Sequence, residues 1–114
     1  MRTLDDLHIK ENDRQAIREA TAILRSRFPV RQVVLFGSKA RGSDDAQSDI
    51  DLLVLTSRPV QQEEKDQMTD ALFAVELQRA VVLNKLVVPL EQWEQGLYRV
   101  LPIHSEVARD GVLA

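Results

Sequence analysis

Two aspartates, Asp49 and Asp51, stand at the start of an apolar run that continues to Leu55. If this run is a strand, both side chains leave the same face, because residues two apart on a strand point the same way. They would lie roughly 7 Å apart along the strand. Two carboxylates at that spacing suit one hard cation or bridge two, and Mg²⁺ carrying a phosphate chain fits them. The spacing therefore predicts a metal site for one or two ions.

A second apolar run, residues 33–36, leads into the small-residue turn of Gly37 and Ser38. A glycine lets the backbone approach a ligand closely, and a helix that starts after it offers unpaired N–H groups to a phosphate. The cations of Lys39 and Arg41 follow, where each would either reach a triphosphate or lie on a solvated helix face. Such a turn alone is typical of ordinary loop structure. Together with the nearby acid pair, it indicates a nucleoside triphosphate site.

The segment from Gly37 to Leu53 reads Gly-Ser, then Ala-Arg-Gly, then Ser-Asp-Ile-Asp-Leu. This order resembles the signature of the DNA polymerase beta-type nucleotidyltransferase superfamily, and the short chain resembles its minimal nucleotidyltransferase branch. The resemblance implies Mg²⁺-dependent transfer of a nucleoside monophosphate, AMP from ATP, to a hydroxyl with loss of pyrophosphate. The residues that it implies are Asp49 and Asp51 as catalytic metal ligands, and Gly37, Ser38, Lys39, Arg41 and Ser48 in nucleotide binding.

One departure from the family pattern falls on the third expected strand. Many active members carry a third acidic residue there, but residues 81–90 contain no carboxylate. Asn84 and Lys85 are the polar candidates, and neither replaces a metal-binding base, because an amide is neutral and an ammonium group repels Mg²⁺. Asp44 and Asp45, in the polar loop 42–48, are interpreted as solvated acids. The third catalytic role is unassigned, which leaves it open whether the chain is an enzyme.

The pattern of apolar residues predicts strands alternating with helices. The resemblance implies an α/β (α+β) fold, a small mixed sheet of three to four strands flanked by helices, as in polymerase beta-like nucleotidyltransferases. We expect strands over 32–36, 49–56 and 81–90, helices over 12–27 and 61–79, and a last helix that Pro102 opens and Gly111 closes. The second helix has a main apolar stripe that should face the sheet. Its other stripe, containing Phe73 and Leu77, is either embedded or a partner-binding surface.

Composition places the chain among ordinary globular proteins and narrows its surroundings. With 114 residues, we expect a single minimal nucleotidyltransferase domain over 1–114. The chain has no cysteine, so it has no disulfides or thiolate metal sites. No apolar run reaches the roughly 20 residues of a membrane span, and no signal peptide is visible, which predicts a cytoplasmic protein. The formal net charge of −3 disfavours direct nucleic-acid binding.

Two main kinds of function fit these features, and a domain that only senses nucleotides is a third possibility. The ending of the chain resembles minimal nucleotidyltransferases encoded beside HEPN-type helical proteins, which implies an antitoxin that modifies a hydroxyl on its toxin partner. The alternative is a catalytically weak or inactive binding subunit that neutralises a helical partner by complex formation, which the missing third acid favours. A homo-oligomer is compatible with either function.

Overall fold

The computed structural model describes residues 1–43 and 49–114. Within these residues, five strands form one mixed sheet in the order β1-β5-β2-β3-β4. β2 is antiparallel to its neighbours β3 and β5, whereas β3 with β4 and β1 with β5 are parallel pairs. In chain order the elements are β1 (Arg2–Thr3), η1 (Leu4–Asp6), α1 (Glu11–Arg27), β2 (Val30–Phe36), α2 (Ser38–Arg41), β3 (Ile50–Thr56), α3 (Gln62–Arg79), β4 (Leu83–Pro89), α4 (Leu90–Gln95), η2 (Leu97–Val100), α5 (Pro102–Asp110) and β5 (Val112–Leu113).

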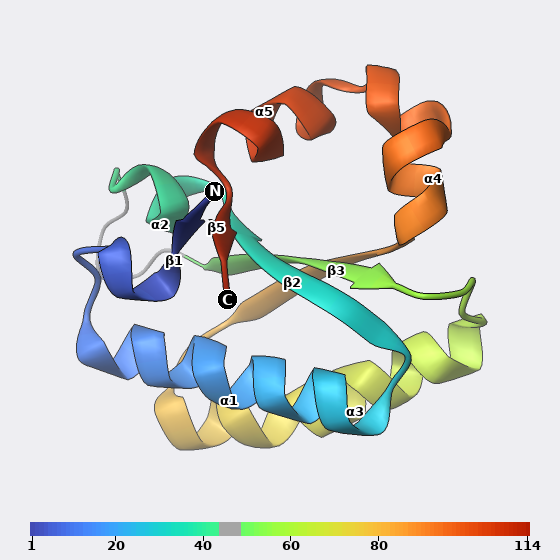
Figure 1. Ribbon diagram of the computed structural model, residues 1–114. Helices are drawn as coiled ribbons and strands as arrows, with labels where there is room; N and C mark the ends of the chain where they lie inside the picture. Colours follow the sequence, from blue (N-terminus) through green and yellow to red (C-terminus); the bar gives the residue numbers. More distant parts are fainter. Residues whose placement is uncertain (44–48) are drawn as a thin grey trace.

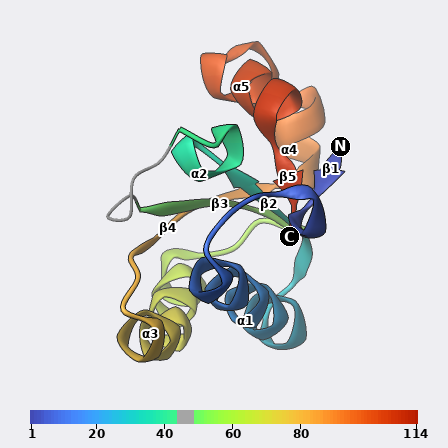
Figure 2. The same ribbon diagram turned by 90° about the vertical axis from the view of Figure 1, so that its left-hand side faces the viewer.

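Helices cover both faces of the sheet (Figure 1). α1 and α3 lie on one face, and α4 and α5 lie on the other, as the view in Figure 2 shows. β3 supplies side chains to both cores. Leu52 and Val54 pack in the cluster with α1 and α3, whereas Leu53 and Leu55 pack with Trp93 of α4 and its neighbours. Both faces of β3 are covered, which agrees with the continuous apolar run from Leu52 to Leu55.

Arg79, the last residue of α3, joins this helix to α1. Its guanidinium donates two hydrogen bonds to the Glu19 carboxylate, at 3.1 and 2.7 Å, and these bonds lower the pKa of Glu19. The Asn12 side chain donates to the Arg79 carbonyl oxygen at 2.7 Å. The N-cap position of α1 is held by Lys10, two residues before Asn12. The Asn12 amide instead satisfies a carbonyl at the end of α3, which would otherwise lack an intrahelical partner.

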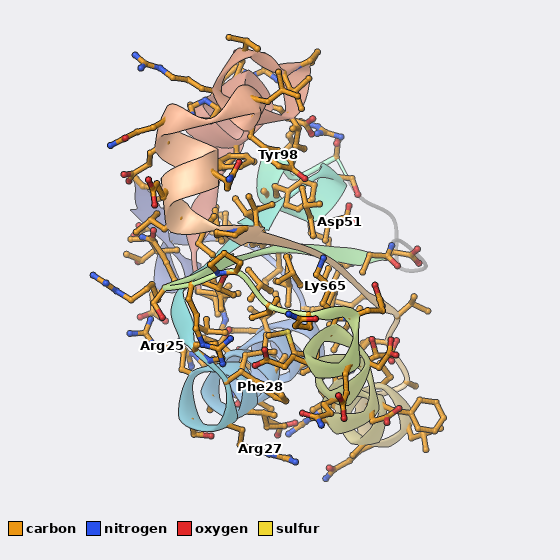
Figure 3. The ribbon with its side chains drawn as sticks, turned by 90° about the vertical axis from the view of Figure 1, so that its right-hand side faces the viewer. Arg25, Arg27, Phe28, Asp51, Lys65 and Tyr98 are labelled. Carbon is orange, nitrogen blue, oxygen red and sulfur yellow. The ribbon has the colours of Figure 1, made fainter. Side chains whose placement is uncertain are left out.

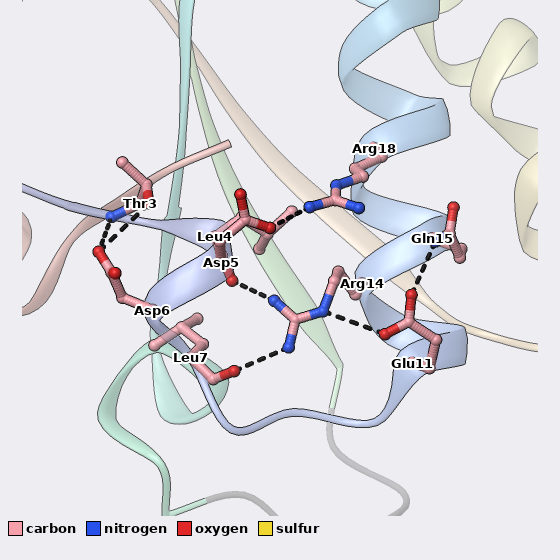
Figure 4. A network of polar contacts seen from close by, with 9 residues as sticks. All are labelled: Thr3, Leu4, Asp5, Asp6, Leu7, Glu11, Arg14, Gln15 and Arg18. Carbon is pink, nitrogen blue, oxygen red and sulfur yellow. Dashed lines mark hydrogen bonds and ion pairs between the residues drawn. The ribbon is translucent and has the colours of Figure 1, made fainter.

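The chain before α1 is fastened to the first turns of that helix (Figure 4). The Arg14 guanidinium donates to the carbonyl oxygens of Leu4 and Leu7. One turn further along α1, Arg18 forms an ion pair with Asp5. These contacts fix the start of the chain, where β1 adds to β5 at the edge of the sheet. Sequence patterns gave no indication of this arrangement.

The predicted α/β (α+β) class, a small mixed sheet flanked by helices, is confirmed. The sheet has more strands than the three to four expected, because β1 and β5 add at one side. Each has two residues, too few to show the alternation that marks a strand in sequence. Pro102 opens α5 and Gly111 follows its last residue, as predicted. Among the described residues, no helix has the length and apolarity required to cross a membrane.

Candidate active site

The residues predicted to do chemistry meet where β2 ends and β3 begins. Asp51 pairs with Phe36, the last residue of β2, on one side and with Asn84 of β4 on the other. Gly37 follows Phe36 directly, so the Gly-Ser turn lies beside the acidic start of β3. Asp49 is exposed just before β3 begins, and Asp51 is half-buried.

Asp49 and Asp51, which we call the acid pair, share one hydrogen-bond partner. The Asn84 Nδ2 atom donates to Oδ2 of Asp49 at 2.9 Å and to Oδ1 of Asp51 at 3.3 Å. Both carboxylates therefore reach the same amide. Figure 3 shows Asp51 on the side of the sheet that carries Tyr98, whereas Lys65 lies on the α3 side. The acid pair thus faces the α4 and α5 side, at an end of β3 that these helices leave accessible.

Gly37 brings the backbone of the turn against Asp51. Its φ of +78° and ψ of −159° lie in a region that residues with a side chain rarely adopt. A Cβ placed on Gly37 would be 2.3 Å from Oδ2 of Asp51, far inside contact distance. Both the backbone conformation and the available space therefore require glycine here. This close approach leaves the main chain of the turn and one carboxylate of the acid pair facing the same small region.

Lys39 is buried, although the sequence suggested that it binds nucleotide. The side chain is 2% exposed, and its Nζ atom donates to the Asp13 carboxylate at 3.0 Å. Asp13 belongs to α1, on the opposite face of the sheet from Asp51. The cation therefore fastens α2, and with it the Gly37 turn, to α1.

Two arginines also connect α2 to the rest of the chain: Arg41 of α2 itself and Arg2 near the start of the chain. The Arg41 guanidinium, also predicted to bind nucleotide, donates to Glu106 of α5 at 2.9 Å. The Arg2 guanidinium donates to the Ala40 carbonyl oxygen at 2.9 Å and to the Asp110 carbonyl oxygen at 2.8 Å. These contacts tie the short α2 helix to α5 and to the start of the chain. They fix the position of the turn that precedes α2.

The remaining predicted site residues divide into two groups. Ser38 is the first residue of α2 and is half-buried, next to Gly37 at the acid pair. Ser48, together with the loop acids Asp44 and Asp45, lies outside the described residues.

The donor atoms at the acid pair suit a hard divalent cation. Mg²⁺ prefers carboxylate, carbonyl and water oxygens, and often keeps few protein ligands when a phosphate chain supplies the others. Asp49 and Asp51 provide carboxylate oxygens, and the Asn84 side chain has an amide carbonyl oxygen. In residues 1–43 and 49–114, no group of three or more histidine, cysteine, aspartate or glutamate side chains is arranged for a metal. The site therefore fits a cation that brings further ligands with it.

Asn84 was named from the sequence but given no role, and Arg2 and Asp13 were missed. Asn84 becomes visible as a site residue only through the parallel register of β4 with β3, which no local pattern reveals. Lys85, its neighbour, points to α3, where its Nζ atom contacts Thr69. Burial lowers the pKa of Lys85, against the opposing effect of nearby Glu76 and Asp66.

Comparisons with known proteins agree with this geometry. The family model described as "Nucleotidyltransferase domain" matches residues 17–109. A Methanocaldococcus jannaschii protein named as a candidate protein adenylyltransferase is 33% identical over 78 residues, covering 67% of this chain and 73% of that protein. The solved structure of a candidate minimal nucleotidyltransferase is 28% identical, with a TM-score of 0.58, and the match covers 92% of this chain and 96% of that one.

A crystal structure of a toxin-antitoxin with AMP-PNP has the same fold. Its matching chain is 17% identical, with a TM-score of 0.56, over 87% of this chain and 69% of that one. The family model covers most of the residues that build the sheet, the Gly37 turn and the acid pair. The chain belongs to the nucleotidyltransferase domain family.

Proposed function

We propose that this chain is an Mg²⁺-dependent nucleotidyltransferase that passes a nucleoside monophosphate, AMP from ATP, to a hydroxyl group. The observation that carries the proposal is the approach of the Gly37 backbone to Asp51, beside Asp49. It places a turn suited to a phosphate next to carboxylates suited to a cation. In the reaction, the acceptor oxygen bonds to the α-phosphorus, the bond from that phosphorus to the bridging oxygen breaks, pyrophosphate leaves, and the hydroxyl proton passes to solvent.

Each residue of the turn and the acid pair has a role in this proposal. Asp49 and Asp51 would hold one or two Mg²⁺ ions, which would neutralise charge on the phosphates and lower the pKa of the attacking hydroxyl. The Gly37 backbone and the Ser38 hydroxyl bind the triphosphate. Holding the nucleotide between the turn and the acid pair orients it for attack, and such positioning, together with electrostatic stabilisation, provides most of the catalysis in phosphoryl transfer.

The choice of ATP and of a protein acceptor rests on the relatives. The M. jannaschii protein is named for adenylyl transfer to protein, and the toxin-antitoxin neighbour was solved with AMP-PNP. We propose that residues 1–114 act as one minimal domain in the cytoplasm and serve as the antitoxin of a HEPN-type helical toxin. The acceptor is the hydroxyl of a tyrosine on that toxin.

Replacing both carboxylates should stop nucleotidyl transfer. For Asp49→Asn with Asp51→Asn, we expect transfer of label from α-labelled ATP and Mg²⁺ to fall at least about a hundredfold, because the charges that hold the cation are gone. The acceptor in the assay is the purified HEPN-type protein of the proposed toxin-antitoxin pair. The control is Asp66→Asn with Asp70→Asn, which removes the same charge from exposed positions on α3. Transfer that survives in the first variant would overturn the assigned roles.

A second candidate function has its own observation. Phe73 and Leu77 lie one turn apart on α3 and are 56% and 68% exposed. The embedded reading of this stripe is therefore wrong for both residues. Large apolar side chains exposed together favour a protein-binding surface. In this alternative, the chain neutralises a helical partner by covering it, without catalysis.

Phe73→Glu tests the alternative directly. If the chain acts by binding, the substitution should weaken its complex with the helical neighbour at least about tenfold in calorimetry, because a charge would replace an anchoring ring. Gln67→Glu, exposed on the same helix, is the control for added charge. Asp51→Asn should leave neutralisation intact under the binding function and abolish it under the transferase function.

A further inference from the structure

The Asn84 amide links the two carboxylates of the acid pair. Its Nδ2 atom donates to Asp49 at 2.9 Å and to Asp51 at 3.3 Å. The residue belongs to β4, where the parallel register sets it beside Asp51, and its side chain is exposed at the mouth of the site. The two carboxylates carry like charges and repel each other, and the N–H₂ group that they share reduces that repulsion. The amide therefore organises the acid pair before any ligand is present.

The same amide has an oxygen on its other side. An asparagine presents N–H donors and a carbonyl oxygen on one planar group, and rotation about its last side-chain bond exchanges their positions. The oxygen is a ligand that Mg²⁺ accepts. In the present arrangement the N–H₂ group occupies carboxylate lone pairs that a cation would need. Asn84 thus competes with the cation in one orientation and supports it in the other.

The charge of the donor set decides how strongly the site holds a cation by itself. Two carboxylates and a neutral amide give a formal charge of −2, and no further carboxylate joins them among the described residues. Divalent-cation affinity rises with the charge of the ligands. A triphosphate would contribute several more negative charges and oxygen ligands.

We propose that Asn84 makes cation binding conditional on the nucleotide. Without nucleotide, the amide keeps its hydrogen bonds to the acid pair, and the cation binds weakly. With nucleotide, the phosphates supply the missing charge, the amide turns, and its oxygen faces the cation. This inference rests on the proposed nucleotidyl-transfer function and assigns Asn84 as the residue that couples the two ligands.

Mn²⁺ binding tests this coupling without any turnover. Calorimetry would measure the affinity of wild type, Asn84→Asp and Asn84→Ala for Mn²⁺ alone and for Mn²⁺ with a non-hydrolysable ATP analogue. We expect wild type to bind the analogue at least tenfold more tightly with Mn²⁺ than without it. Asn84→Asp should bind Mn²⁺ alone at least tenfold more tightly than wild type does, and Asn84→Ala should weaken the Mn²⁺-analogue complex about tenfold. Gln67→Glu controls for the added charge, and melting temperatures check that each variant folds.

The outcomes separate this inference from the proposed function. If wild type binds the Mn²⁺-analogue complex, and Asp49→Asn with Asp51→Asn removes that binding, the result supports the acid pair as the cation site. Equal Mn²⁺ affinity in wild type and Asn84→Asp, within about twofold, would then overturn the Asn84 inference alone. If wild type binds neither Mn²⁺ nor its analogue complex, both the inference and the proposed function fail.

Discussion

Gly37→Ala should slow nucleotidyl transfer about a hundredfold while leaving a folded chain. The new Cβ would lie 2.3 Å from Oδ2 of Asp51, so that carboxylate must move by about 1 Å or more. A displacement of this size in a catalytic group costs about a hundredfold in rate. The backbone would also be strained at a φ of +78°, at a cost of about 1–3 kcal/mol. Label transfer from α-labelled ATP measures the first effect, and thermal unfolding measures the second.

Gly42 offers a matched control for this substitution. It also has a positive φ, +73°, but a Cβ there would meet no atom within 4 Å. Gly42→Ala should therefore lower stability by about 1 kcal/mol through its left-handed backbone and leave transfer within about twofold of wild type. If Gly37→Ala were no slower than Gly42→Ala, the close approach of the turn to Asp51 would have no part in the reaction.

The centre of the site was predictable because its signals are local. The order of apolar run, glycine turn and second apolar run fixes two adjacent elements, and the two-residue period of a strand fixes which face carries Asp49 and Asp51. Each of these rules acts over a few residues. The sequence therefore predicted that Gly37 lies near the acid pair, and in the structure a Cβ on Gly37 would overlap the Asp51 carboxylate.

The positioning contacts were not predictable, because they join single residues far apart in the chain. Lys39 and Asp13 are 26 positions apart, and Arg2 and Asp110 are 108 apart. A lysine that follows a turn suited to phosphate is expected to contact the ligand, because most lysines are exposed. Here it is among the largest fully buried side chains. Nothing in the composition near Lys39 distinguishes these two outcomes, because the ion pair that Lys39 forms depends on Asp13, in the first turn of α1.

The contacts of Lys39, Arg41 and Arg2 all hold α2 in place. Lys39 pairs with α1, Arg41 pairs with α5, and Arg2 holds the carbonyl end of α2. A helix of four residues has little stability of its own, because forming its first turn fixes several residues for one hydrogen bond. Anchoring at its side chains replaces the missing length. The Gly37 turn is thereby held at a fixed distance from the acid pair.

Lys39→Met should be the most destabilising charge substitution in this region. It removes the cation that faces Asp13, whose side chain is 9% exposed, and leaves that carboxylate in a dry environment. Breaking a buried ion pair by removing one partner costs about 3–5 kcal/mol. Domains are typically stable by about 5–15 kcal/mol, so the loss would be a large share of the total. Denaturant unfolding, followed by circular dichroism, measures it as a drop in the transition midpoint.

Two further variants test this prediction, one as a control and one for recovery of stability. Arg41→Met breaks the more exposed pair with Glu106 and should cost at most about 1 kcal/mol. Adding Asp13→Leu to Lys39→Met removes the stranded carboxylate and should recover part of the lost stability, because a buried pair replaced by apolar side chains is often tolerated. A different result would restore the interpretation from sequence: if Lys39→Met unfolded like wild type but bound the ATP analogue at least tenfold more weakly, Lys39 would serve the phosphates rather than the fold.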